Sequence, residues 1–174
     1  MTHADIDSFS SEWNKFTTKV KGKLLKESKR KPVDYHTAEE ILRETKVCWS
    51  SPYEATGRWL KGLSEKDSDK GTRIIAQLDK IHFEEIAERK SPLPFLLFII
   101  PLLFGAGGFL IAMFLTQSWL IRIASAVLPA ALMFFTTKIA YSNIKSTLQK
   151  RLISKYMDQL DVYSDKIKKI LKST

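Results

Sequence analysis

One stretch of the chain constrains the fold more than any other. Residues 91–137 carry a single charged side chain, Arg122, among 47 positions, whereas roughly every third residue outside the stretch is charged. A lipid bilayer requires such segregation, and a soluble fold seldom needs it. The sequence therefore predicts an integral membrane protein. The alternative is a helical hairpin buried inside a soluble bundle. The remaining, heavily charged helices would then have to cover two fully apolar helices.

The length of this stretch predicts two membrane spans. One helix of that length would extend about 70 Å, against a hydrocarbon core of about 30 Å. Two spans of about 20 residues fit instead, over about 93–115 and 119–137, with residues 116–118 as a tight turn. Trp119 beside the turn suits the headgroup level of a bilayer. We expect a two-helix transmembrane hairpin over residues 92–138, entered at Ser91.

The basic residues predict the orientation of this hairpin. Before the first span there are 18 Lys and Arg residues and after the second there are 9, against none in the turn. Positively charged flanks stay on the cytoplasmic side, so both termini should be cytosolic. Cys48 is the only cysteine, which excludes an internal disulfide and suits a reducing compartment.

The cytosolic region 1–91 begins with an apolar stripe at helical spacing. Its members recur every three or four residues, which places them on one side of an amphipathic helix: Ile6, Phe9, Trp13, Phe16, Val20 and Leu24. The opposite side is basic, with Lys15, Lys19, Lys23 and Lys26. We interpret the stripe as core packed against sister helices; the alternative is a helix lying on an anionic membrane surface.

Two capping-box patterns predict further helix starts, at Thr37 and at Ser51–Pro52. A polar run at residues 64–71 is interpreted as a loop, followed by a helix that leads to Ser91. The apolar residues of these helices are the expected core: Ile41, Cys48, Trp49, Tyr53, Trp59, Leu60, Leu63, Ile75, Leu78, Ile81 and Ile86.

The cytosolic C-terminal region 139–174 is predicted to continue the second membrane helix, because no Gly or Pro interrupts the chain from Ala130 to residue 174. Six apolar residues alternate spacings of three and four, a heptad seam of coiled-coil type: Ile153, Tyr156, Leu160, Tyr163, Ile167 and Ile170. The seam can complete a cytosolic helical bundle with the N-terminal helices or pair with another copy. The predicted fold class is all-α.

Small residues inside the spans predict close helix packing. Gly108 and Ala112 in the first span, and Ala126 and Ala130 in the second, are spaced four apart, and Gly105 lies one turn earlier. Small side chains let helix backbones approach in lipid. They pack the two arms of one hairpin together or, as the alternative, also mediate oligomerisation.

Three span residues are candidates for a lumen or gate. Pro101 and Pro129 should kink the helices. Arg122 lies one turn past Trp119, from where its side chain can reach the interface. The alternative is that Arg122 faces other copies or a water-filled lumen.

Chemistry at other positions is sparse. His3, His36, His82 and Cys48 lack metal-ligand spacing, and no catalytic constellation is visible. We therefore expect no enzyme, cofactor, metal or small-molecule substrate. The net charge of +9 raises nucleic acid as a partner, but membrane topology explains the basic residues, so nucleic acid is not expected.

In overall plan the chain resembles the two-span membrane effectors of bacterial antiphage systems, of the retron and cyclic-nucleotide types. The resemblance rests on cytosolic helices, a tight hairpin from Leu93 to Thr137, and a helical tail. It implies a bacterial inner membrane, and membrane damage with growth arrest when a cytosolic partner or sensor triggers the protein. Expected partners are the lipid bilayer, further copies of the chain and that cytosolic protein. The alternative function is a membrane scaffold, adaptor or regulatory subunit that holds a soluble partner.

Overall fold

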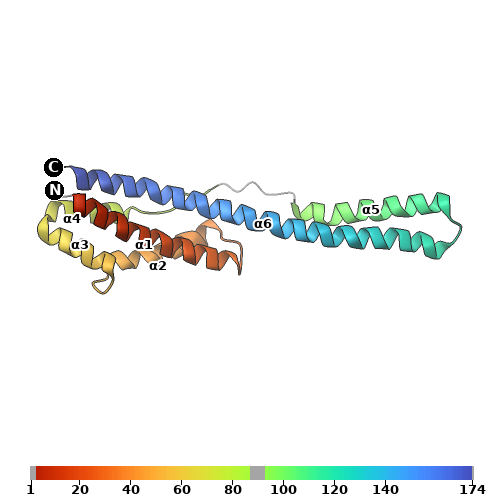
Figure 1. Ribbon diagram of the computed structural model, residues 1–174, viewed down its shortest axis with the longest axis horizontal. Coiled ribbons are helices and arrows are strands. Elements are labelled where there is room, and N and C mark those ends of the chain that lie inside the picture. The colour runs from red at the N-terminus through yellow and green to blue at the C-terminus, as the bar shows by residue number, and fades with distance from the viewer. Residues whose placement is uncertain (1–2, 87–92, 174) are drawn as a thin grey trace. The chain divides into compact units, whose positions relative to one another are not determined.

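The computed structural model describes residues 3–86 and 93–173, which form helices and no strand (Figure 1). The predicted all-α class is confirmed for these residues. The chain divides into two compact units, Met1–Ile86 with Gln149–Thr174 (unit 1) and Ala87–Leu148 (unit 2). The helices are α1 (His3–Ser28), α2 (Tyr35–Ser50), α3 (Ala55–Lys66), α4 (Ser68–Asp79), α5 (Leu93–Leu115) and α6 (Trp119–Lys172).

The apolar stripe of α1 is core, as interpreted from its spacing. Phe9, Phe16, Val20 and Leu24 are buried, and the ring centroids of Phe9 and Trp13 lie 5.6 Å apart. Trp49 and Trp59 extend this aromatic cluster from α2 and α3. Because the bundle covers the stripe, α1 has no free apolar face with which to lie on a membrane surface.

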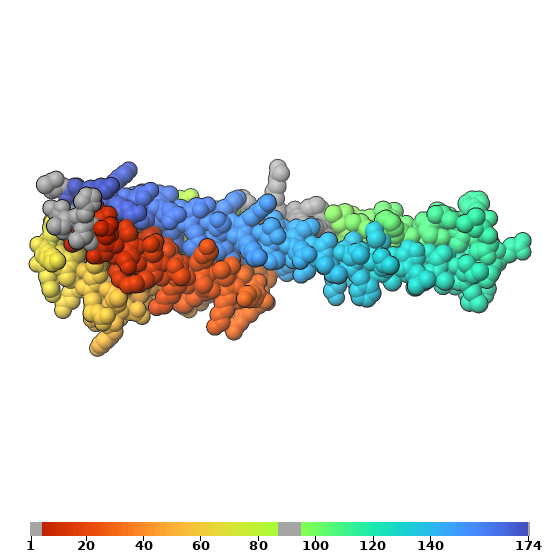
Figure 2. Space-filling view, in the orientation of Figure 1, coloured from red at the N-terminus to blue at the C-terminus, as the bar shows by residue number. Residues whose placement is uncertain are grey.

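The heptad seam of α6 belongs to the same core. Ile153, Tyr156, Leu160 and Ile167 are buried in one cluster with the α1 stripe, and Figure 2 shows the end of α6 along α1. The ring of Tyr156 lies 4.6 Å from that of Phe83, centroid to centroid. The seam therefore pairs within its own chain, which decides between the two alternatives that the sequence left open.

The predicted helix starts were misplaced. α2 begins earlier than Thr37, because the Asp34 carboxylate caps it by accepting a 2.8 Å hydrogen bond from the Thr37 N–H. This hydrogen bond holds the pKa of Asp34 below its ordinary value. α3 begins at Ala55, and residues 51–54 form the connection instead of its first turn. Tyr53 lies in this connection and is 88% exposed, so its predicted burial was wrong.

The loop predicted at residues 64–71 is also wrong. Asp67 alone separates α3 from α4: its N–H bonds the Leu63 carbonyl at 2.9 Å, and its carboxylate accepts from the Lys70 N–H at 3.1 Å. The polar residues there form helix termini, because a single aspartate can end one helix and cap the next. Gly71 lies so close to Ser64 that a side chain there would overlap it.

The helix expected to run on to Ser91 stops at Asp79. Residues 81–86, which we call the strap, are not helical, although Ile81 and Phe83 are buried. Within α4, Ile74 is buried and Ile75 is largely exposed, contrary to the prediction for Ile75. The Lys46 ammonium caps the end of α4 by donating to the Asp79 carbonyl (3.0 Å), and it also donates to the Ile81 carbonyl of the strap (2.9 Å). The predicted membrane entry at Ser91 lies outside the described residues.

The remaining expected core positions agree with the structure. Leu60, Leu63, Leu78, Cys48 and Trp49 are buried, and Ile41, Trp59 and Ile86 are partly buried against the core.

Candidate functional site

Two described helices are long and apolar enough to cross a membrane, by length and composition: the stretch Phe95–Leu115 of α5, and α6. α5 ends at Leu115 and α6 begins at Trp119, as the spacing of the apolar runs predicted. α6 then continues without a break to Lys172. Both helices expose large apolar side chains, among them Phe98, Leu102, Phe114, Leu128 and Leu132.

The small residues of these helices meet at one contact. A side chain built on Gly108 would overlap the backbone oxygen of Ser125. One built on Gly105 would lie 3.1 Å from both the Ala126 oxygen and the Ala130 Cβ. Ala112, the next small residue along α5, is buried. Four of the five predicted packing residues, Gly105, Gly108, Ala126 and Ala130, thus lie where α5 and α6 approach within one chain, whereas Gly107 has nothing within 4 Å of such a side chain.

Arg122 binds the end of α5. Its Nε donates to the Thr116 carbonyl at 2.9 Å, and its Nη2 donates to the same oxygen at 2.7 Å and to the Met113 carbonyl at 3.4 Å. The last carbonyls of a helix lack partners in their own helix and carry partial negative charge, which favours a cation. The guanidinium therefore closes the 116–118 turn, a role that its sequence position did not suggest.

Arg122→Leu is expected to destabilise the α5–α6 pair by roughly 1–3 kcal/mol, because charge-assisted hydrogen bonds to the Thr116 carbonyl are lost. Arg122→Lys keeps the charge but not the planar fork of donors, so it should recover only part of this loss. Thermal unfolding in lipid nanodiscs, followed by Trp119 fluorescence in a chain whose other tryptophans are Phe, measures both. An Arg122→Leu protein as stable as its parent would contradict this role.

The other gate candidates lie within continuous helices. α5 runs across Pro101, which is buried, and α6 runs across Pro129, which is half-buried. The Pro129 Cγ would lie 3.5 Å from a side chain added at Gly108, so this proline borders the α5–α6 contact. A lumen or gate role for Arg122, Pro101 and Pro129 stays a prediction.

The basic side of α1 is partly paired with carboxylates. Lys15 lies 2.6 Å from Glu12, Lys19 lies 3.4 Å from Glu54, and Lys23 lies 3.0 Å from Glu44. Lys26 is exposed near the end of the helix. Glu12 is buried, whereas the pairs of Lys19 and Lys23 are exposed, and exposed ion pairs contribute little to stability. They do lower the net positive charge that this surface presents.

The strap bonds to two helices of unit 1. The Phe83 N–H donates to Glu39 of α2 at 2.8 Å. The Glu84 N–H donates to the side-chain oxygen of Gln159 of α6 at 2.9 Å, and the Gln159 amide donates back to the Glu84 carbonyl at 3.3 Å. Sequence analysis missed the strap because Glu39 and Gln159 lie far from it along the chain.

No family model, curated protein or solved structure matches the chain. Within the described part of the chain, no cluster of three or more His, Cys, Asp or Glu side chains could hold a metal ion. Burial raises the pKa of the Cys48 thiol, which keeps it in the less reactive protonated form.

Proposed function

We propose that this chain is a non-enzymatic, two-span membrane effector. In this proposal α5 and the first part of α6 form a hairpin across the membrane, with both termini in the cytosol. A cytosolic signal reorganises unit 1, and the hairpins of several copies then permeabilise or distort the bilayer. Antiphage defence at a bacterial inner membrane is the setting implied by the resemblance in overall plan.

The observation that carries the proposal is the continuity of α6. One helix contains the apolar stretch that follows Trp119 and also the seam residues Tyr156, Leu160 and Ile167, which are buried in the core of unit 1. A rigid helix can transmit a displacement from one end to the other. A signal that loosens the seam therefore has a mechanical route to the apolar stretch.

The strap supports the same mechanism. The chain leaves unit 1 for the apolar helices through the strap and returns through α6. Glu84 of the strap and Gln159 of α6 are joined by two hydrogen bonds, so unit 1 holds both connections together. Releasing one connection would therefore change the restraint on the other.

Expression of the chain without its restraining partner, or with its trigger supplied, is expected to depolarise the cytoplasmic membrane and halt growth. A potential-sensitive dye and culture density measure the two effects. The matched control is Leu103→Arg, which adds a charge near the middle of α5 at an insertion cost of about 2.5–3.5 kcal/mol and should abolish both effects. An intact membrane potential at full expression and triggering would favour the scaffold or adaptor alternative.

Reporter fusions test the proposed topology separately. Fusions after residue 90 and after residue 174 should both report the cytosol, because basic residues flank the spans on these sides. A fusion at Gln117 should report the opposite side. Opposite locations for the two ends of the chain would exclude a two-span arrangement, and a cytosolic Gln117 would exclude a crossing hairpin.

A further inference from the structure

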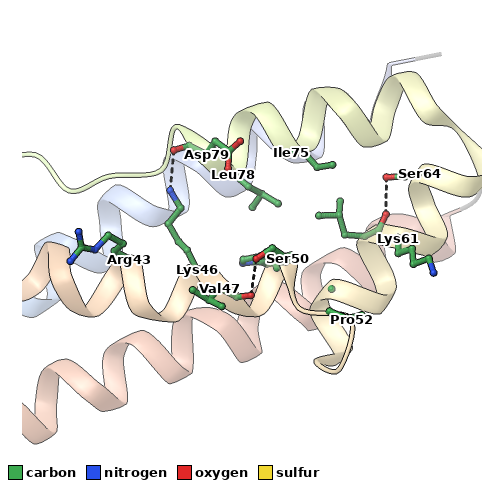
Figure 3. A pocket seen from close by; sticks show the side chains of 13 residues that line it. Arg43, Lys46, Val47, Ser50, Pro52, Lys61, Ser64, Ile75, Leu78 and Asp79 are labelled. Carbon is green, nitrogen blue, oxygen red and sulfur yellow. Dashed lines mark hydrogen bonds between the residues drawn. The ribbon is translucent and has the colours of Figure 1, made fainter.

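Unit 1 contains an open cavity between α2, α3 and α4 (Figure 3). Its volume is about 550 Å³, within the range of about 300–1,000 Å³ typical of small-molecule sites. The lining is mainly apolar. Its walls include Val47 and Trp49 of α2, Leu60 of α3, and Ile75 and Leu78 of α4.

Exposed apolar side chains of unit 1 gather at this cavity. Among the described residues of the unit, the large hydrophobic residues that are exposed are Val47, Tyr53, Ile75 and Val162. Val47 (61% exposed) and Ile75 (43%) line the cavity, and Tyr53 follows Pro52, which also lines it. Exposed apolar side chains that surround a cavity are typical of a ligand-binding site.

The polar groups of the cavity favour an anion. Three cationic residues, Arg43, Lys46 and Lys61, line it, against one acidic lining residue, Asp79. The Lys46 ammonium is held by the Asp79 and Ile81 carbonyls, and burial lowers its pKa. Arg43 and Lys61 are exposed at opposite ends of the cavity (Figure 3), and the Lys61 ammonium also lies 3.9 Å from the Glu65 carboxylate.

We propose that this cavity binds a small organic anion with an apolar body. The apolar body packs between Val47, Ile75 and Leu78. The anionic group lies toward Arg43, for whose guanidinium the described residues give no carboxylate partner closer than 4 Å. This site lies within unit 1 and does not depend on the membrane function proposed above. Bound there, such a ligand contacts three helices of the bundle at once, so its occupancy stabilises their arrangement.

The test uses the full chain in lipid nanodiscs and naphthalene-2-sulfonate as the probe. Equilibrium dialysis with empty nanodiscs subtracts binding to the lipid. We expect saturable binding of one probe per chain, with a Kd of about 1 mM or tighter for a ligand of this size. The absence of saturable binding above that of empty nanodiscs would overturn the proposal.

Matched variants locate the binding. Ile75→Asp places a carboxylate in the apolar wall at a position that is already largely exposed, and it should weaken binding at least tenfold. Val162→Asp, on α6 outside the cavity, should leave the affinity unchanged. Equal binding by wild type and Ile75→Asp would overturn the proposal.

The charge preference has its own control. Arg43→Gln should weaken binding of the sulfonate several-fold while leaving binding of neutral naphthalene-2-methanol unchanged, whereas Lys61→Gln at the opposite end of the cavity should change binding of the sulfonate little. A naphthalene carrying a trimethylammonium group should bind more weakly than the sulfonate. Equal or tighter binding of this cation to the wild-type chain would overturn the assignment to an anion.

Discussion

Gly57→Ala should destabilise unit 1 by about 3 kcal/mol, at the upper end of the cost of overpacking. A Cβ at position 57 would overlap the backbone oxygen of Ser51 and approach the Cys48 carbonyl to 3.2 Å. Backbone atoms cannot rotate away as a side chain can, so α3 would have to move from the end of α2. That movement would also strain the 2.8 Å hydrogen bond from Thr56 to the Cys48 carbonyl.

Gly62→Ala in the same helix is the matched control. Nothing lies within 4 Å of a side chain added there, so this change should stabilise α3 by up to about 1 kcal/mol through helix propensity alone. Thermal unfolding of the full chain, followed by tryptophan fluorescence, compares the two variants, since Trp13, Trp49 and Trp59 lie in unit 1. Equal stability of the two alanine variants would contradict the close approach of α3 to α2.

Gly108→Ala should disrupt the contact between α5 and α6. The added methyl group would overlap the Ser125 backbone oxygen, and in the membrane setting proposed for these helices no hydrophobic force would compensate for lost packing. Gly105→Ala should have a smaller effect, because its contacts of 3.1 Å require a shift of only a few tenths of an ångström. We expect the separation of the helices to increase and vary more widely in Gly108→Ala.

Spin labels on cysteines introduced at Phe104 and Leu132, both exposed, allow electron–electron resonance to measure this separation. The native Cys48 is buried and the pKa of its thiol is raised, so it should stay unlabelled. Gly107→Ala is the control, because nothing lies near its added methyl group. A distance distribution in Gly108→Ala identical to that of the control would refute the packing.

The sequence by itself determined the features that depend on local patterns. The near absence of charged residues between positions 91 and 137 predicted where α5 lies and where α6 begins. Both features depend only on residues adjacent in the chain, namely the length of an apolar run and the polar residues at 116–118. The spacing of Phe9, Trp13 and Phe16 likewise revealed the buried side of α1, since helical periodicity alone decides which residues share a face.

Only the tertiary structure decided where these helices end and which elements they pack against. The seam of α6 fits another helix of either this chain or a second copy, and burial of Tyr156 against Phe83 selects the chain's own core. At the end of α4, Lys46 of α2 binds the carbonyl of its last residue, Asp79, and that of Ile81 in the strap. The hydrogen bonds of the strap and of Arg122 likewise depend on the tertiary structure. Each of them joins a backbone group to a side chain from another element, and the periodicity of the sequence does not encode such a pairing.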